Sequence, residues 1–376
     1  MVMHTSKLIL TKLLKQAGIS INGNKPYDIQ VHDDRFYSAV IGNWSLGLGE
    51  SYMQGFWSCK QMDEMIHRLL TSNLDRKQLR WNNVPLLLHY LKSSFLNLQS
   101  MKRAFQVGQL HYDLGNTFFT SMLDPYMQYS CAYWKNAQNL DQAQQQKLEM
   151  VCQKLYLKPN DRVLEIGCGW GGFAAYAIKK YNINYTGISV SKEQIDYAKK
   201  KCHNLNANFK LMDYRKISGQ YDKIVSIGMF EHVGRKNYAD FFELAHQHLK
   251  DEGLFLLHTI GCSKTKIATD PWVHKYIFPN GYIPSYQQIT KNIEGYFHIE
   301  DWHNFGFFYD HTLMAWHQNF SKNWSLHEAN YPKDFYRMWE YYLLSCAGYF
   351  RAKKGQLWQI MLTKLGSQKK YISYRP

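Results

Sequence analysis

Short strand-like runs alternate with helix-like runs between residues 162 and 259, and this alternation constrains the fold more than any other feature of the chain. Strands that alternate with helices favour a parallel sheet with helices on both faces, because each connection crosses the sheet to return to the same edge. Two further strand-like runs follow toward the C-terminus. We therefore predict an α/β fold with strands at residues 162–166, 184–189, 207–211, 223–227, 254–259, 298–302 and 356–363.

In the first hundred residues, apolar side chains recur at helical spacing instead. Stripes at 8–14 and 62–70 predict helices, and a stripe at 82–97 predicts a helix that either packs on a core or lies in a membrane interface. The glycine-rich run 42–50 favours turns and close packing. We expect a mainly helical N-terminal domain and a larger α/β domain, at residues 1–100 and 101–376.

The strongest local signal is the run GCGWGG at residues 167–172, directly after the first predicted strand. Glu165 precedes it, and a helix-like run follows it. Glycines permit positive φ and let a ligand lie against bare backbone, and open α/β sheets bind ligands at the carboxyl ends of their strands. The strand before this run and the helix after it therefore indicate a nucleotide-type cofactor site.

The end of the second predicted strand narrows the choice of cofactor. A dinucleotide site needs a carboxylate there to hold the ribose hydroxyls, and this chain has Ser189 instead. S-adenosylmethionine (SAM) tolerates a hydroxyl or an amide, which Ser189 and Gln194 supply. After the third strand, Asp213 and Tyr214 are placed to meet an adenine edge and face, although an Asp in this position also commonly caps a turn.

Titratable side chains interrupt apolar runs at further places. Glu231 follows the fourth predicted strand and His258 ends the fifth, so we expect both at the same sheet edge as the glycine run. Cys131 lies in a run of aromatic residues. Each also has a simple structural explanation, because such histidines are commonly packed and hydrogen-bonded, and single cysteines are commonly small buried hydrophobic residues.

The formal net charge of +15 favours a polyanionic partner, either nucleic acid or anionic lipid headgroups. No zinc-finger or helix–turn–helix spacing is evident, so we expect no nucleic acid. The 28 Tyr, 20 Phe and 11 Trp can line an apolar cleft and stabilise cations. The 7 cysteines form no CxxC pair, which favours reduced thiols in a cytoplasmic protein without a metal site, and we find no signal peptide or transmembrane run.

Several motifs in fixed order resemble those of cyclopropane-fatty-acyl-phospholipid synthases over almost the whole chain. They are HYDLGN (111–116), MLDP (122–125), YSCAYW (129–134), GCGWGG (167–172), GMFEHVG (228–234), LHTIG (257–261), DPW (270–272) and KYIFPNG (275–281). The run SLGLGESYM (45–53) also resembles the bacterial members that act on phospholipids, whereas the related mycolic-acid cyclopropane synthases are shorter and lack it.

The resemblance implies a SAM-methyltransferase, Rossmann-like fold: a mostly parallel seven-stranded sheet with one antiparallel edge strand, helices on both faces and a smaller helical N-terminal domain. It implies a homodimeric enzyme that transfers the methylene carbon of SAM to the cis double bond of an unsaturated phospholipid acyl chain, through a carbocation that bicarbonate deprotonates. The family's bicarbonate ligands correspond to Cys131, Glu231, His258, Tyr309 and the backbone of Ile260. Its SAM contacts correspond to Tyr129, Ser130, Gly167, Gly169, Ser189, Gln194, Asp213 and Tyr214.

Such chemistry makes two demands on the site. The carbocation needs a dry aromatic cavity, in which rings such as Trp134, Tyr276 and Phe278 each contribute about 0.5–2 kcal/mol. Because an ionised Glu231 would repel bicarbonate, we expect either a protonated Glu231 or a positively charged His258.

The lipid substrate implies peripheral binding to an anionic membrane from the cytoplasmic side, with the N-terminal domain and the loop 263–285 as the docking face. Three other functions remain open. They are an N- or C-methyltransferase for a small amine or an already soluble lipid precursor, an acyl methyltransferase that makes methyl-branched or hydroxylated chains, and a non-catalytic membrane- or RNA-binding protein. An amine acceptor needs no bicarbonate site, and a non-catalytic protein would leave the glycine run or the anion site degraded.

Overall fold

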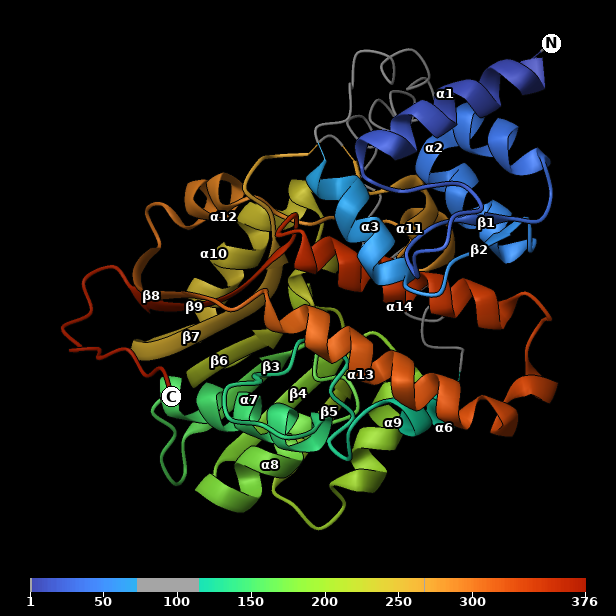
Figure 1. Cartoon of the computed structure of the whole chain (residues 1–376). Helices are drawn as coiled ribbons and strands as arrows, with labels where there is room; N and C mark the ends of the chain where they lie inside the picture. Colours follow the sequence, from blue (N-terminus) through green and yellow to red (C-terminus); the bar gives the residue numbers. More distant parts are fainter. Residues whose placement is uncertain (1, 73–114, 267) are drawn as a thin grey trace. The chain divides into compact units, whose positions relative to one another are not determined.

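The computed structural model describes residues 2–72, 115–266 and 268–376 (Figure 1). These residues belong to two compact units, which are described separately. The first unit contains 2–72, 268–279 and 313–355, and the second contains 115–266, 280–312 and 356–376. Two segments that the sequence analysis placed in the α/β domain, 268–279 and 313–355, thus join the N-terminal segment in one unit. The predicted helix at 82–97 and residues 111–114 of the first motif lie outside the described residues.

The first unit is mainly helical, as predicted. Its elements are α1 (Val2–Gln16), β1 (Gln30–Val31), α2 (Arg35–Met53), β2 (Trp57–Ser58), α3 (Met62–Thr71), α11 (Pro271–Tyr276), the greater part of α13 (Phe308–Asn323), η5 (Trp324–Leu326), η6 (Glu328–Asn330) and α14 (Phe335–Arg351). In the described ranges, none of the helices is both long and apolar enough to span a membrane.

The glycine-rich run 42–50 lies inside α2, so the predicted turns are absent except for one break between two helical stretches. The backbone departs from helical geometry at Trp44, where φ is 45° and the helix is kinked. The prediction of close packing is confirmed at Gly49, because an added Cβ would lie 2.3 Å from Cδ1 of Trp272 in α11. Absence of a side chain there lets the two helices of this unit approach each other.

A seven-stranded sheet forms the centre of the second unit, in the order β5-β4-β3-β6-β7-β9-β8. This confirms the predicted α/β class. The strands are β3 (Arg162–Ile166), β4 (Asn184–Ser189), β5 (Ala207–Leu211), β6 (Tyr221–Ile227), β7 (Leu249–Gly261), β8 (Phe297–Asn304) and β9 (Gln356–Lys364).

Only β9 runs antiparallel within this sheet, and it pairs with β7 on one side and β8 on the other. The resemblance implied one antiparallel strand at the edge. That position was wrong, because β7 and β8 run in the same direction and the last strand inserts between them. The outermost strand on this side is therefore β8.

Helices cover both faces of the sheet, as predicted (Figure 1). They are α6 (Asn116–Met122), α7 (Leu140–Lys154), α8 (Gly172–Tyr181), α9 (Lys192–Lys201), α10 (Tyr238–His248) and α12 (Tyr286–Ile293), with the short turns η2 (Tyr214–Lys216), η3 (Phe230–His232) and η4 (Arg235–Asn237). Successive residues of β3 point to opposite faces. Val163 joins a core cluster with residues of α7 and α8, whereas Leu164 joins a second cluster with residues of α10.

The parallel arrangement brings the ends of several strands to one edge of the sheet. The glycine run follows β3, Ser189 ends β4, and Asp213 and Glu231 come shortly after β5 and β6. His258 lies opposite Ile227, the last residue of β6, although β7 continues beyond it to Gly261 along β9. The prediction that His258 ends its strand was therefore wrong, but its level in the sheet matches the end of β6.

Candidate active site

The glycine run after β3 adopts backbone conformations that favour glycine. Gly167 has a φ of +88° and Gly169 a φ of +50°. The loop is held to β4, because the amides of Gly167 and Cys168 donate to the carbonyl oxygen of Ile188 at 3.0 and 2.9 Å.

The surroundings of the two glycines differ. A Cβ on Gly167 would lie 2.6 Å from Cβ of Met229, in the segment after β6. A Cβ on Gly169 would meet no heavy atom within 4 Å. The loop therefore touches the segment that carries Glu231, and at Gly169 it presents open backbone of the kind that a nucleotide-type ligand lies against.

Ser189 and Gln194 lie together at the end of β4. Ser189 Oγ donates to Oε1 of Gln194 at 2.9 Å and accepts from the amide of Ser191 at 3.2 Å. Ser191 in turn caps α9, because its Oγ accepts from the amide of Gln194 at 3.3 Å. Both predicted side chains are buried, and this turn holds them in place.

Asp213 and Tyr214, which follow β5, both interact within the protein. The carboxylate of Asp213 accepts two hydrogen bonds of 2.7 Å from the guanidinium of Arg215 and a third, of 3.0 Å, from its amide. The ring of Tyr214 is buried edge-on against Phe241 of α10, with 5.4 Å between centroids. Its hydroxyl has no hydrogen-bond partner among the described residues. Asp213 thus caps a turn, the alternative that the sequence left open, and Tyr214 belongs to the core.

Tyr129 and Ser130 lie against α6 and α7. The Tyr129 ring packs edge-on against Phe119, with 5.3 Å between centroids. Ser130 faces the end of β6, because a Cβ on Gly228 would lie 3.7 Å from Cβ of Ser130. The segment that precedes Cys131 therefore reaches the carboxyl edge of the sheet.

Glu231 is anchored to β7 by one oxygen of its carboxyl group. The amide of Ile260 donates to Oε1 of Glu231 at 2.6 Å. In the described part of the chain, Oε2 is buried without a hydrogen-bond partner. Burial raises the pKa of Glu231 to about 7, although the bond from Ile260 acts in the opposite direction.

His258 is fully buried in β7. Its Nδ1 lies 3.3 Å from Nε2 of Gln359 in β9, whereas its Nε2 has no partner among the described residues. Burial, assisted by the charges of Lys147 and Lys154, holds the pKa of His258 well below its usual range. The imidazole is therefore neutral at physiological pH.

Cys131 lies beside Thr312 of the helix that also carries Tyr309. The hydroxyl of Thr312 lies 4.0 Å from Sγ of Cys131 and accepts from the amide of Ala132 at 3.1 Å. Tyr309 is buried and lies one helical turn before Thr312 in α13. Burial raises the pKa of the Cys131 thiol, so the thiol is protonated at neutral pH.

Two paths link the Cys131 segment to His258. The His258 ring lies edge-on to Phe305 at 5.9 Å, and Phe305 lies edge-on to Tyr133 at 5.4 Å. In addition, the carbonyl of His258 accepts from the amide of Gly228, the residue that Ser130 faces. The structure thus brings the Cys131 segment, Glu231 and His258 to one edge of the sheet in the second unit.

Of the aromatic residues predicted to face a carbocation, Trp134 belongs to the second unit, where its indole N–H donates to Oγ1 of Thr312 at 2.9 Å. Tyr276 and Phe278 belong to the first unit. There the hydroxyl of Tyr276 donates to Oε1 of Glu50 at 2.8 Å.

Lys147, a fully buried residue of α7, was not among the predicted site residues. Its ammonium group donates to Oε1 of Gln128 and, at 3.0 Å, to Oγ of Ser130. A signal existed, because Lys147 lies at helical spacing from Leu140, Gln144 and Val151, which form the buried face of this helix.

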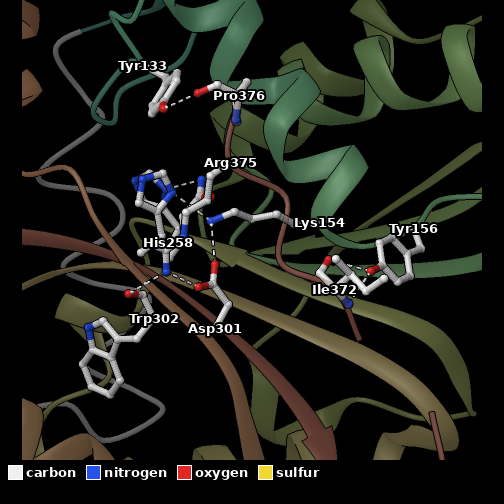
Figure 2. A network of polar contacts seen from close by, with 11 residues as sticks. Tyr133, Lys154, Tyr156, His258, Asp301, Trp302, Ile372, Arg375 and Pro376 are labelled. Carbon is white, nitrogen blue, oxygen red and sulfur yellow. Dashed lines mark hydrogen bonds and ion pairs between the residues drawn. The ribbon is translucent and has the colours of Figure 1, made fainter. Parts of the chain in front are cut away.

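A polar network surrounds a second buried lysine, Lys154, at the end of α7 (Figure 2). Its Nζ lies 3.4 Å from Oδ2 of Asp301 in β8 and 3.1 Å from Nδ1 of His303. Arg375 pairs with the other carboxylate oxygen of Asp301. Figure 2 shows this network beside His258, and both cations find their counter-charge in Asp301.

Comparisons with known proteins agree with this architecture. Residues 99–360 match the family model described as mycolic acid cyclopropane synthetase. The chain is 50% identical over 363 residues to the cyclopropane-fatty-acyl-phospholipid synthase of Escherichia coli strain K12, which covers 95% of this chain and 93% of that protein. It is 34% identical over 267 residues to a probable fatty acid methyltransferase of Pseudomonas putida, which covers 68% of each chain.

Among solved structures, the mycolic acid cyclopropane synthase CmaA1 in complex with SAH and CTAB is 31% identical, with a TM-score of 0.65. The match covers 69% of this chain and 97% of that one. Coclaurine N-methyltransferase shares the fold at 21% identity, with a TM-score of 0.68 over 84% of this chain and 99% of that one. The chain therefore belongs to the cyclopropane-fatty-acyl-phospholipid synthase family of SAM-dependent methyltransferases.

Proposed function

We propose that this chain transfers the methylene carbon of SAM to the cis double bond of an unsaturated phospholipid acyl chain, and that bicarbonate is the base that allows the cyclopropane ring to close. Family membership supports the reaction class. One observation supports the base: Oε2 of Glu231 and Nε2 of His258 are both buried and unpaired in the described part of the chain. An unsatisfied buried polar atom costs about 1–3 kcal/mol, so two of them at one sheet edge favour a small polar guest.

The hydrogen-bonding capacity of these two residues fits an oxyanion. If Nδ1 of the neutral His258 accepts from Gln359, the ring carries its proton on Nε2 and donates it to the guest. A protonated Glu231 donates from Oε2 in the same way. Bicarbonate, when bound, would supply a general base that, unlike a glutamate carboxylate, is not permanently attached to the protein.

The protonation states favour one of the two alternatives that the sequence left open. A positively charged His258 is disfavoured, since burial lowers its pKa well below the usual range. A protonated Glu231 is favoured, because its pKa of about 7 leaves the carboxyl group largely neutral below that pH. The charge repulsion that would otherwise oppose an anion is thereby reduced.

For SAM, which supplies the methyl group on a sulfonium, we propose Gly167 and Gly169 as the backbone surface, with Tyr129, Ser130, Ser189 and Gln194 as further contacts. The open space at Gly169 and the fixed Ser189–Gln194 pair support this assignment. The buried carboxylate of Asp213 and the ring of Tyr214 would act by shaping the end of β5, since both already have partners in the protein.

The remaining residues exclude water from the reacting centre. Cys131, His258 and Thr312 are fully buried, and Cys131 presents a neutral thiol. A dry site prevents water from trapping a carbocation as an alcohol. An amine acceptor carries its own lone pair and needs neither this exclusion nor a base of this kind, so the site favours an alkene.

We further propose that the enzyme works as a homodimer at the cytoplasmic surface of an anionic membrane. The net charge of +15 supports the membrane part of this proposal, because each Lys or Arg near an anionic surface contributes about 1 kcal/mol of attraction. The homodimer rests on the family resemblance alone.

Incubation of the purified chain with SAM and vesicles of unsaturated phospholipid, followed by lipid mass spectrometry and proton NMR, tests the proposed reaction. We expect a gain of one CH₂ unit with cyclopropane proton signals, and no product from vesicles of saturated phospholipid. A methyl-branched, hydroxylated, methoxylated or N-methylated product would replace the proposal with a different acceptor chemistry.

A further inference from the structure

Lys147 is buried in the middle of α7 without an acidic partner. Its ammonium group donates to Oε1 of Gln128 and to Oγ of Ser130, both of which are neutral acceptors. No carboxylate of the described residues forms an ion pair with it. Since an uncompensated buried charge is strongly destabilising, this lysine indicates that negative charge is supplied by something other than its hydrogen-bond partners.

A second buried lysine of the same helix provides the contrast. Lys154 lies two turns further along α7 and is equally inaccessible. Its charge is balanced by Asp301, whose Oδ2 lies 3.4 Å from Nζ. Figure 2 shows this ion pair. The fold thus provides a counter-ion for one lysine and only neutral partners for the other.

Two acidic groups, Asp124 and Glu165, influence the pKa of Lys147, but both form their hydrogen bonds with other residues. The Asp124 carboxylate accepts from the amides of Tyr126 and Gln128 at 2.8 Å each. Glu165 accepts from the hydroxyl of Tyr185, and burial raises the pKa of Glu165 to about 7.

The other titratable groups that interact with Lys147 are Cys131, whose thiol is neutral, and His258, whose ring is neutral. Burial lowers the pKa of Lys147 itself to about 8, so the amine is mostly protonated at neutral pH.

The position of Lys147 relates this charge to the proposed bicarbonate site. Its ammonium holds Ser130, the residue directly before Cys131. Its charge also reaches His258 strongly enough to lower the pKa of that ring. A positive charge that disfavours an imidazolium equally favours an anion at the same place.

We propose that Lys147 is a positioning residue whose positive charge stabilises the oxyanion held by Glu231 and His258. This inference rests on the proposed function, because the anion is the bicarbonate of that reaction. With Lys147 as the source of positive charge, an anion binds beside a carboxyl group without a charged histidine. The hydrogen bond from Lys147 to Ser130 holds the Cys131 segment near the ammonium group.

Binding of ¹³C-labelled bicarbonate, measured by NMR on the purified full chain without SAM or lipid, tests this proposal independently of turnover. Lys147→Met keeps the volume and removes the charge, and we expect bicarbonate affinity to fall by about ten- to a hundredfold. Lys147→Arg keeps the charge and should retain most of the affinity. Lys154 also lowers the pKa of His258, but Asp301 balances its charge and keeps Arg375 as a partner when Lys154 is replaced. Lys154→Met should therefore reduce bicarbonate affinity clearly less than Lys147→Met does. Thermal melting of each variant establishes that the protein is folded at the temperature used.

Steady-state kinetics then distinguish loss of the Lys147 charge from a general structural defect in the variant. In Lys147→Met we expect a raised KM for bicarbonate and a kcat that approaches the wild-type value when bicarbonate is saturating. Unchanged bicarbonate affinity in Lys147→Met, equal losses in Lys147→Met and Lys154→Met, or a loss of SAM affinity alone would each overturn the proposal. The last result would instead assign Lys147 to the carboxylate of SAM.

Failure of this inference is distinguishable from failure of the proposed function. If the wild type forms cyclopropane lipid but binds no bicarbonate, Lys147 does not have this role and methylene transfer stands. If bicarbonate binding depends on Lys147 but no cyclopropane lipid forms, the anion site stands and the proposed reaction is wrong.

Discussion

The backbone amide of Ile260 donates a 2.6 Å hydrogen bond to one carboxyl oxygen of Glu231, while the other oxygen of that group is buried without a partner among the described residues. Ile260 lies two residues beyond His258 on β7. This bond therefore ties the segment after β6 to the strand that carries the histidine. One carboxyl oxygen of Glu231 thus binds the backbone, and the other is available to the proposed bicarbonate.

Replacement of Glu231 by Gln should separate these two tasks. The amide oxygen still accepts from Ile260, so the fold is retained, but the titratable group is lost. We expect turnover to fall by about 10²- to 10⁴-fold, with SAM affinity within about twofold of the wild type. Product formation by lipid mass spectrometry and SAM binding by calorimetry measure the two quantities. Near-normal turnover would remove Glu231 from the mechanism.

Stability should depend on pH through the same group. The pKa of Glu231 is about 7 in the folded protein and about 4.5 when the group is unperturbed. The stabilising contribution of the bound proton is thus fully present below about pH 4.5 and lost as pH rises to about 7. The shift corresponds to about 3 kcal/mol at most.

Urea unfolding at pH 5 and pH 7.5 measures this effect. We expect the free energy of unfolding to decrease between these values by less in Glu231→Gln than in the wild type. Glu165→Gln is the matched control, because burial raises the pKa of Glu165 to about 7 as well. The double variant should show a still smaller decrease. Identical pH dependence in all proteins would refute the raised pKa values.

The two glycines of the loop after β3 should respond differently to alanine. In Gly167→Ala, the new methyl group meets Met229 at 2.6 Å and φ is +88°, so we expect a stability loss of about 2–4 kcal/mol. In Gly169→Ala, the methyl enters open space at a φ of +50°, so the loss should be about 1 kcal/mol. SAM affinity should fall at least tenfold in the folded Gly169→Ala protein, and unchanged affinity would show that SAM does not lie against Gly169.

Tyr214→Phe should be nearly silent in SAM binding. The Tyr214 ring packs on Phe241, and its buried hydroxyl has no partner in the described part of the chain, so its removal costs no hydrogen bond. We expect unchanged or slightly increased stability, within about 1 kcal/mol, and SAM affinity within about twofold of the wild type. A large loss of SAM affinity would show that the hydroxyl contacts the cofactor.

Vesicle binding should be electrostatic. We expect binding of the chain to anionic unsaturated vesicles to weaken steeply with added salt, because the basic excess is screened over about 10 Å at 0.1 M ionic strength. Zwitterionic vesicles of the same acyl composition serve as the control and should bind weakly at every salt concentration. Sedimentation of vesicles with bound protein measures both, and salt-independent binding would contradict the proposed docking.

Local patterns predicted several elements correctly. The predicted bounds of β3, β4 and β5 agree with the structure, and a helix, α8, follows the glycine run as predicted. Alternation, turn residues and glycines mark these ends within a few neighbouring residues. The same patterns placed Glu231 at the sheet edge. They did not predict that β9 inserts between β7 and β8, because strand order depends on pairing between segments that are far apart in sequence.

Only the tertiary structure determined which side chains are buried and which groups they contact. Tyr214 was predicted to meet an adenine face, and only the fold shows that its ring is buried and contacts Phe241 of α10 edge-on. No role was predicted for Lys147, and packing of α7 buries its ammonium next to Ser130. The amino-acid sequence determines which side chains can carry charge and which segments favour a strand or a helix. The free energy of a charge depends on what surrounds it in three dimensions, so only the assembled fold determines whether that charge is solvated, paired or kept for a guest.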